Sequence, residues 1–196
     1  IPEGVRVGMQ LSDDGNRLNI TAGKAKFQVA ALDAKAFPDM TKVTSGVKFK
    51  LNSSEVKKLM SKALFASATD ETRAYLNGIY LHVVKNEEGD QVLRAAATDG
   101  HRLARVDSKM PEGAADMQGI IIPRKTVNEL RKLAEDSDEI NFTVSDRLLK
   151  AEAGSLTLTS KLVDGNFPDY TKVIPTGNPL DPVSYTHLTL PTTPYV

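Results

Sequence analysis

The sequence predicts an α+β fold in which one β-α-β-β-β unit occurs twice within a single domain. Apolar residues first alternate with a period of two and then recur at helical spacing, and this order appears near residue 47 and again near residue 119. A heptapeptide is also repeated, because Phe-Pro-Asp-Met-Thr-Lys-Val at 37–43 returns as Phe-Pro-Asp-Tyr-Thr-Lys-Val at 167–173. The chain is therefore expected to contain two copies of one domain type, the first of them incomplete.

The first unit is expected to begin with a strand that leads directly into a helix. Residues 47–51 alternate apolar and polar side chains, and Asn52 and Glu55 have the spacing of a capping box. The apolar stripe that follows has helical spacing and comprises Val56, Leu59, Met60, Ala63 and Leu64. After a loop at 69–74, strands are expected at 78–84, 91–97 and 101–106, joined by turns at 86–90 and at Asp99-Gly100.

The second unit repeats this order. Residues 119–122 form a short apolar strand, and Pro123 suits the first turn of a helix. The buried stripe of that helix is expected to comprise Val127, Leu130, Leu133 and Ala134. Strands at 139–144, 147–153 and 156–160 complete the unit. We therefore expect two helices and a continuous antiparallel sheet.

The repeat offset of 130 residues divides the chain into domains. At this offset Arg17 falls on Arg147 and Leu32 on Leu162, so the similarity extends over the strands before the heptapeptide. We expect 1–43 to be the C-terminal part of a first domain and 44–179 to be a complete second domain. Residues 180–196 carry one charge among many Thr and Pro residues, and are expected to be a non-native tail such as a read-through product. A native flexible linker is the alternative.

Composition excludes several classes of function. Lys and Arg number 25 and Asp and Glu number 25, so no bulk basicity points to nucleic acid. The absence of cysteine excludes a disulfide framework, thiolate metal sites and a Cys nucleophile. No apolar run approaches the ~20 residues of a membrane span. We expect a cytoplasmic protein with no membrane partner, no metal and no cofactor.

Four segments carry a resemblance to a known family. They are Tyr75 to Gly78, Ala97 to Ala104, Ile122 to Lys125 and Ser160 to Tyr170. Together they resemble the bacterial DNA sliding clamp, the β subunit of DNA polymerase III, and the similarity extends over residues 1–179. The resemblance implies a non-catalytic processivity factor with three such domains per subunit, whose homodimer ring has helices lining the pore and antiparallel sheets outside. The implied partners are double-stranded DNA, the replicative polymerase and clamp-loader subunits.

The resemblance also implies a cleft that binds partner peptides containing Gln, Leu and Phe. Its residues here would be Leu76, Thr98, Gly100, His101, Arg102, Leu103, Pro168, Lys172, Val173 and Ile174. Such a peptide needs an apolar pocket for its anchors and polar groups at the rim. From the residues alone, Asp99-Gly100 could equally be a hairpin turn, with Leu76 and Val173 in the core. The family often has Arg at position 172, and Lys172 lacks its planar hydrogen-bonding fork.

Contact with DNA is a separate hypothesis, which concerns the polar faces of the two helices. The basic residues on these faces are Lys57, Lys58, Lys62, Arg124, Lys125, Arg131 and Lys132. The resemblance implies that they line the hole and attract phosphates without reading base sequence. Ordinary solvation of exposed lysines is the alternative. Arg73 and Tyr75 are also carried over as DNA-contacting residues, although Asp70 and Ala74 depart from the family pattern beside them.

An enzymatic alternative would use Asp99, His101 and Arg102 as a phosphodiester hydrolase. A carboxylate, an imidazole and a guanidinium are suitable groups for that reaction. However, no second His or carboxylate stands at a spacing that completes a metal site, and no Gly-rich phosphate loop is present. We therefore expect a protein that is not an enzyme.

Overall fold

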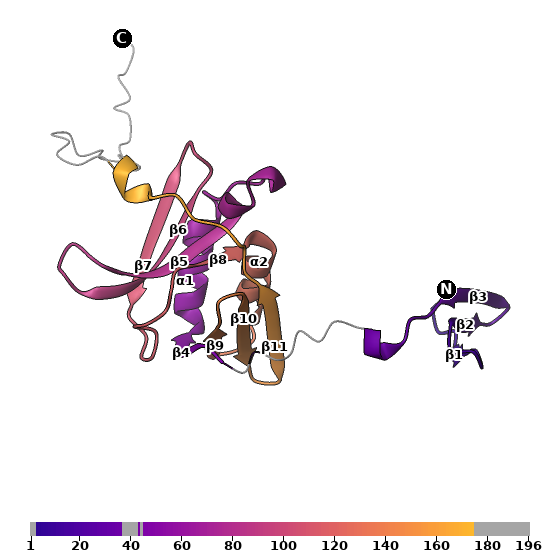
Figure 1. Ribbon diagram of the computed structural model, residues 1–196. Coiled ribbons are helices and arrows are strands. Elements are labelled where there is room, and N and C mark those ends of the chain that lie inside the picture. Colours follow the sequence, from indigo (N-terminus) through magenta and orange to yellow (C-terminus); the bar gives the residue numbers. More distant parts are fainter. Residues whose placement is uncertain (1–2, 37–42, 44, 175–196) are drawn as a thin grey trace, which may run out of the picture.

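The computed structural model describes residues 3–36, 43 and 45–174 (Figure 1). The heptapeptide predicted to end the first domain begins at Phe37 and lies, apart from Val43, outside the described residues. The tail predicted at 180–196 also lies outside them.

The first described unit is a three-stranded antiparallel sheet. It contains β1 (Val7–Leu11), β2 (Arg17–Ala22) and β3 (Ala25–Ala30), and a short 3-10 turn, η1 (Ala34–Ala36), follows. The register pairs Met9 with Ile20 and Ile20 with Phe27. Directly paired residues share a face, so one face of this sheet is apolar throughout. Its apolar residues are Val7, Met9, Leu11, Leu18, Ile20, Ala22, Ala25, Phe27 and Val29.

The first β-α-β-β-β unit follows the predicted order. β4 (Val47–Asn52) leads into α1 (Ser53–Leu64), whose predicted apolar stripe is fully buried. The capping box is not formed, because the Asn52 side chain makes no capping hydrogen bond. Instead, the N–H of Ser53 donates to the carbonyl oxygen of Asp138 over 2.8 Å, which ties the start of α1 to the turn before β9.

The rest of this unit differs from the prediction at two turns. The predicted loop at 69–74 is largely a 3-10 turn, η2 (Glu71–Leu76), which begins where the Asp70 carboxylate accepts the Thr72 N–H. The strands are β5 (Gly78–Lys85), β6 (Gln91–Thr98) and β7 (Leu103–Lys109). β7 begins two residues later than expected, because the N–H groups of His101 and Arg102 donate to the Asp99 carboxylate and not to a strand.

The second unit also follows the predicted order. It comprises β8 (Ile120–Pro123), α2 (Arg124–Leu133), β9 (Glu139–Val144), β10 (Leu148–Ala153) and β11 (Leu156–Lys161). The predicted apolar stripe of α2 is buried. The chain then continues to a final 3-10 turn, η3 (Tyr170–Val173).

The two units exchange their first strands. One four-stranded sheet has the order β11-β10-β9-β4 and the other has the order β7-β6-β5-β8. The expectation of a continuous sheet was therefore wrong for the described residues. Phe49 on β4 pairs with Phe142 on β9 and their rings stack at 5.2 Å, while Ile79 on β5 pairs with Ile122 on β8. Each sheet is thus completed by an apolar contact between units.

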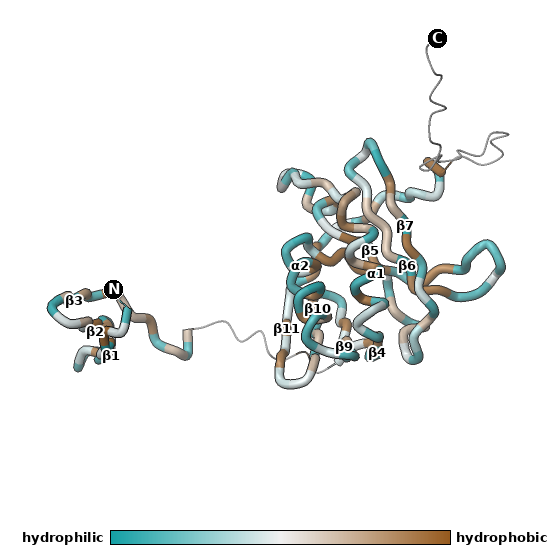
Figure 2. The backbone as a smooth tube through the Cα atoms, turned by 180° about the vertical axis from the view of Figure 1, so that it is seen from behind, coloured by the Kyte–Doolittle hydropathy of each residue, from teal (hydrophilic) through white to brown (hydrophobic). Residues whose placement is uncertain are grey.

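The core lies between the helices and the sheets. α1 and α2 pack against each other, and Leu59, Met60, Val127 and Leu130 are all inaccessible to solvent or nearly so. Figure 2 shows apolar segments within the strands and hydrophilic segments in the turns that connect them. Each helix buries one stripe of apolar residues, and for this reason apolar residues at helical spacing were sufficient to locate both helices in the sequence.

The repeat is visible in the backbone, with a corrected offset. Gly23 and Gly154 both occupy the left-handed region, at φ of 59° and 56°, in the turns of the β2-β3 and β10-β11 hairpins. These turns are 131 residues apart, so Arg17 at the start of β2 corresponds to Leu148 and not to Arg147. The offset of 130 holds only for the heptapeptide, because the first copy has one more residue between hairpin and heptapeptide.

Candidate functional site

A cleft lies where the β6-β7 turn, the end of η2 and the segment around η3 meet. Its volume is about 380 Å³. It is lined by Leu76, Thr98, Gly100, His101, Arg102, Leu103, Pro168, Asp169, Tyr170 and Val173. Residues far apart in the sequence therefore form one recess, as expected for the peptide cleft.

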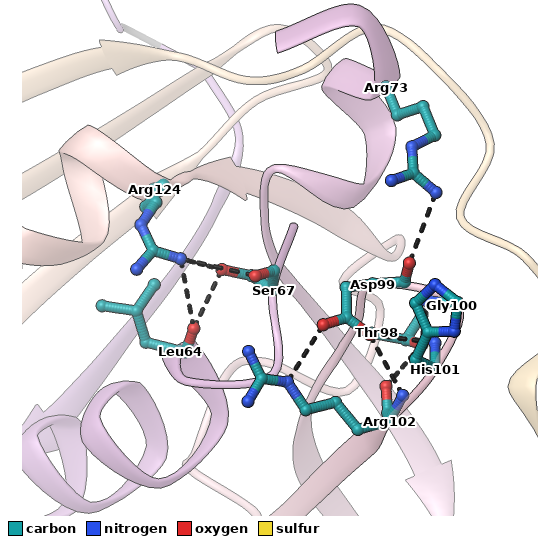
Figure 3. Close-up of polar contacts among 9 residues, drawn as sticks. All are labelled: Leu64, Ser67, Arg73, Thr98, Asp99, Gly100, His101, Arg102 and Arg124. Atoms are coloured by element: carbon teal, nitrogen blue, oxygen red, sulfur yellow. Dashed lines mark hydrogen bonds and ion pairs between the residues drawn. The ribbon is translucent and has the colours of Figure 1, made fainter. Parts of the chain in front are cut away.

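The turn at 98–102 is held rigid by the Asp99 carboxylate (Figure 3). That group accepts the N–H of His101 at 2.9 Å, the N–H of Arg102 at 3.0 Å and the Arg102 Nε–H at 3.0 Å. These donors, with the His101 N–H first, lower the pKa of Asp99 to about 2. Gly100 has a φ of 93°, a value that glycine adopts readily. The polar rim of the cleft is therefore preorganised.

The opposite wall is formed by the segment at 167–173. Tyr170 is buried, whereas Val173 has 69% of its surface exposed beside Pro168 at the cleft. Lys172 is not among the lining residues, and its side chain is 80% exposed and forms an ion pair with Asp169 at 3.3 Å. Ile174 is also absent from the lining. The lining of this recess therefore omits these two predicted residues, and their assignment to the peptide site stays a prediction.

Two lining residues were missed by the sequence analysis. Asp169 and Tyr170 belong to the repeated heptapeptide, of which only Pro168, Lys172 and Val173 were assigned to the cleft. The aromatic residue at the one variable position of that motif, Tyr170 in place of Met40, was the available signal. The sequence left open whether Asp99-Gly100 and Leu76 belong to a turn and the core or to the cleft, and both readings hold in part. Asp99-Gly100 connects two strands, and Leu76 is buried yet lines the cleft. Val173 is not a core residue.

The cleft has the surface chemistry of a peptide-binding site. Leu103, Pro168 and Val173 provide apolar contact, and His101 and Arg102 stand at the rim. The Arg102 guanidinium also lies 5.8 Å from the ring centroid of Phe65, which is within the range of a cation–π contact. An extended segment with apolar anchors would fit this arrangement.

The proposed hydrolase residues do not form a catalytic set. Asp99 accepts three N–H donors and has a pKa near 2, so it is a poor general base. Within the described ranges, no group of three or more His, Cys, Asp or Glu residues could hold a metal ion. The structure therefore gives no support to the hydrolase alternative.

The basic residues of the helices lie at the surface, but three of them have local partners. Lys57, Lys58, Lys62, Lys125 and Lys132 are exposed, while Arg124 and Arg131 are partly buried. Lys58 donates to the carbonyl oxygen of Asp107 at 2.9 Å, and Lys132 pairs with Glu129 at 3.0 Å. Arg124 donates to the Ser67 hydroxyl at 2.6 Å, next to the last turn of α1 (Figure 3). Arg124 therefore also joins the two helices.

The loop that carries the predicted DNA-contacting residues Arg73 and Tyr75 lies beside the cleft turn and also beside the start of α2. Arg73 donates to the carbonyl oxygen of Asp99 at 3.3 Å, so it supports the cleft turn (Figure 3). Tyr75 is exposed. A second recess of about 540 Å³ joins Thr69 and Ala74 of this loop to Arg124, Lys125 and Asn128 of α2. The loop and the start of α2 thus form one surface.

No helix within the described ranges is long and apolar enough to cross a membrane.

Comparison with known proteins identifies the family. A family model described as the central domain of the DNA polymerase III beta subunit matches residues 50–169. The chain belongs to this beta subunit family. The beta sliding clamp of Caulobacter vibrioides is 44% identical over 179 residues, which cover 91% of this chain and 48% of the relative. That of Escherichia coli is 36% identical over 177 residues, covering 89% and 46% respectively.

Solved beta subunit structures agree with this assignment. A crystal structure of the DnaN sliding clamp from Bartonella birtlesii, bound to griselimycin, has a TM-score of 0.74 and 43% identity, covering 91% of this chain and 47% of that one. The expected family and the α+β clamp fold are thereby confirmed. The chain spans about half the length of the beta subunits that it matches. The cleft and DNA residues remain predictions.

Proposed function

We propose that this chain is part of a cytoplasmic bacterial sliding clamp, a non-catalytic homodimer ring that encircles duplex DNA and confers processivity on the replicative polymerase. The observation that carries this proposal is the cleft in a beta subunit fold. Its apolar wall and rigid polar rim suit Gln, Leu and Phe peptides of the polymerase, the clamp loader and other partners.

The helix faces support the DNA part of the proposal. Lys57, Lys62 and Lys125 are exposed on α1 and α2, and Tyr75 is exposed in the loop beside α2. Flexible ammonium groups at a surface attract phosphates without selecting a sequence. Arg124 and Lys58 would contribute less than predicted, because their side chains already bind protein acceptors.

The first unit supports the proposed division into a partial domain at 1–43 and a complete one at 44–179. Leu18, Ile20 and Ala22 correspond, at the hairpin offset, to Leu149, Ala151 and Ala153, which lie in the core. In the second domain, α2 packs on this hairpin, with the hydroxyls of Thr126 and Ser160 2.6 Å apart. We propose that helices of a longer first domain cover the apolar face of β1-β3 in the whole protein, and that 180–196 is non-native.

A peptide titration tests the cleft. A fluorescent peptide with Gln, Leu and Phe anchors is titrated with the protein and with Leu103→Asp, which places a charge on the apolar wall. We expect at least a tenfold loss of affinity, because a carboxylate cannot be buried there without a partner. Leu156→Asp, at an exposed apolar residue in the β10-β11 hairpin, is the matched control and should bind normally. Equal affinity for wild type and Leu103→Asp would refute the site.

A further inference from the structure

One face of the sheet β7-β6-β5-β8 carries a row of polar residues. The register pairs His82 on β5 with Arg94 on β6, and Arg94 with Asp107 on β7. The alternate residues Ile79, Leu81, Leu93 and Ala95 belong to the helix-covered core. Because neighbouring residues of a strand face opposite ways, the row lies on the face away from the core.

Tyr170 of η3 closes over this row. Its hydroxyl lies 2.9 Å from His82 Nε2, and its ring meets the imidazole edge-on with centroids 5.8 Å apart. Phe167 stacks on Tyr80 at 4.8 Å, and Tyr80 stacks on His82 at 4.4 Å. Tyr170 is only 5% exposed. Phe167 and Tyr170 are therefore both held by side chains of β5, Phe167 by Tyr80 and Tyr170 by His82.

These contacts determine where the cleft wall stands. Pro168 and Asp169 lie between the two anchored aromatic residues, and Val173 lies one 3-10 turn beyond. Main-chain bonds tie the preceding segment to other elements at Leu162 and Val163. From 164 to 173, the described residues show no further main-chain bond to another element. Side-chain anchoring thus takes the place of a backbone ladder.

The His82 imidazole is uncharged at pH 7, so its Nε2 can either accept a hydrogen bond from the Tyr170 hydroxyl or donate one to it. Burial, followed by the charge of Arg94, lowers the pKa of His82 to about 4. The Arg94 guanidinium is itself held by two bonds to the Asp107 carboxylate, at 2.5 and 2.7 Å. Its pKa is raised by that pair and further by Tyr170. The imidazole is therefore fixed between a stacked ring, a paired cation and the tyrosine hydroxyl.

We propose that His82 is a positioning residue of the peptide cleft, which it serves by holding Tyr170 and with it the wall formed by Pro168 and Val173. The proposal rests on the cleft being the partner site. It assigns a binding role to a side chain that does not line the cleft. It also explains why a variable position of the repeated heptapeptide carries a buried tyrosine in the second copy.

The test combines three variants with peptide titration. Tyr170→Phe removes the hydroxyl and keeps the ring, His82→Leu removes the hydrogen bond and the stack, and His82→Gln keeps a group that can reach the hydroxyl. We expect Tyr170→Phe and His82→Leu each to weaken peptide binding about fivefold, which is ~1 kcal/mol at 1.4 kcal/mol per factor of ten. The double variant should be no weaker than His82→Leu, and His82→Gln should restore most of the affinity.

A second sheet provides the control for general destabilisation. Leu149→Val alters a buried residue of β10, remote from the cleft, and lowers stability without touching the wall. Normal binding by this variant and weak binding by His82→Leu would support positioning. Wild-type affinity in both His82→Leu and Tyr170→Phe, with Leu103→Asp still deficient, would overturn the proposal and leave the cleft intact. Equal loss in Leu149→Val and His82→Leu would also overturn it. If Leu103→Asp binds normally, the proposed function fails instead.

Discussion

Removal of the Asp107 carboxylate should destabilise the protein far more than removal of an exposed acidic residue. Arg94 and Asp107 form a two-bond ion pair in which the Arg94 side chain is 7% exposed and the Asp107 side chain is 37% exposed. In Asp107→Ala the buried guanidinium keeps its charge, because the ordinary pKa of arginine lies far above neutral pH even without an acidic partner. The cost is therefore that of an uncompensated buried cation.

The magnitude follows from the burial of each partner. Breaking a fully buried pair costs ~3–5 kcal/mol, whereas an exposed pair contributes ~0–1 kcal/mol. Since one partner here is buried and the other is partly exposed, we expect a loss of ~2–3 kcal/mol in the free energy of unfolding. The pKa of Asp107 is lowered chiefly by its bond to Arg94, so this contribution is complete above the ordinary carboxyl pKa and is lost as pH falls through the lowered value.

Urea unfolding at pH 7, followed by circular dichroism, measures this difference. Glu87→Ala is the matched control, because Glu87 pairs with Arg105 at 3.0 Å but is 85% exposed, and we expect it to cost less than ~0.5 kcal/mol. Asp107→Asn keeps the shape of the side chain and should lie between wild type and Asp107→Ala. The reasoning would be refuted if the losses of Asp107→Ala and Glu87→Ala differed by less than ~0.5 kcal/mol, which is roughly the contribution of an exposed pair.

Three further outcomes are expected. Because the folded-state pKa of His82 is about 4 against 6.5 when free, stability should be complete above pH 6.5 and fall as pH is lowered toward 4. The full difference is ~3 kcal/mol, which solvent screening of this partly exposed ring reduces to ~1–2 kcal/mol; a His82→Gln variant with the same pH slope would contradict this. In the full-length protein, Lys62→Ala with Lys125→Ala should shallow the log–log salt dependence of DNA binding by up to about two, equally for two unrelated duplexes; an unchanged slope would assign these lysines to solvation alone. Gly78→Ala should cost ~2–3 kcal/mol in urea unfolding, because its Cβ would stand 2.1 Å from the carbonyl oxygen of Ile122. Gly154→Ala, in open space at a φ of 56°, should cost ~1 kcal/mol. Equal losses in the two variants would remove the steric explanation.

Local patterns in the sequence were sufficient to locate the helices and strands, whereas the cleft was predicted only from the family resemblance. The apolar stripes of α1 and α2 were predicted correctly because a helix repeats every 3.6 residues and buries one stripe, which is a property of neighbouring residues. The residues Thr98 to Leu103 form one contiguous turn, and the resemblance carried them over together as part of the predicted cleft. The family resemblance was found from such contiguous segments and was confirmed.

Only the tertiary structure decided how distant segments combine. The exchange of β4 and β8 between sheets and the bond from Arg124 to Ser67 both depend on contacts that leave no periodic signal. His82 and Tyr170 are 88 residues apart, and each alone resembles an ordinary half-buried residue of a strand or turn. Sequence spacing determined which residues face a core, because side-chain direction along a strand or helix is periodic. Which faces then meet was determined by packing across the whole domain, because apolar burial and hydrogen bonding act between surfaces brought together only in the folded chain.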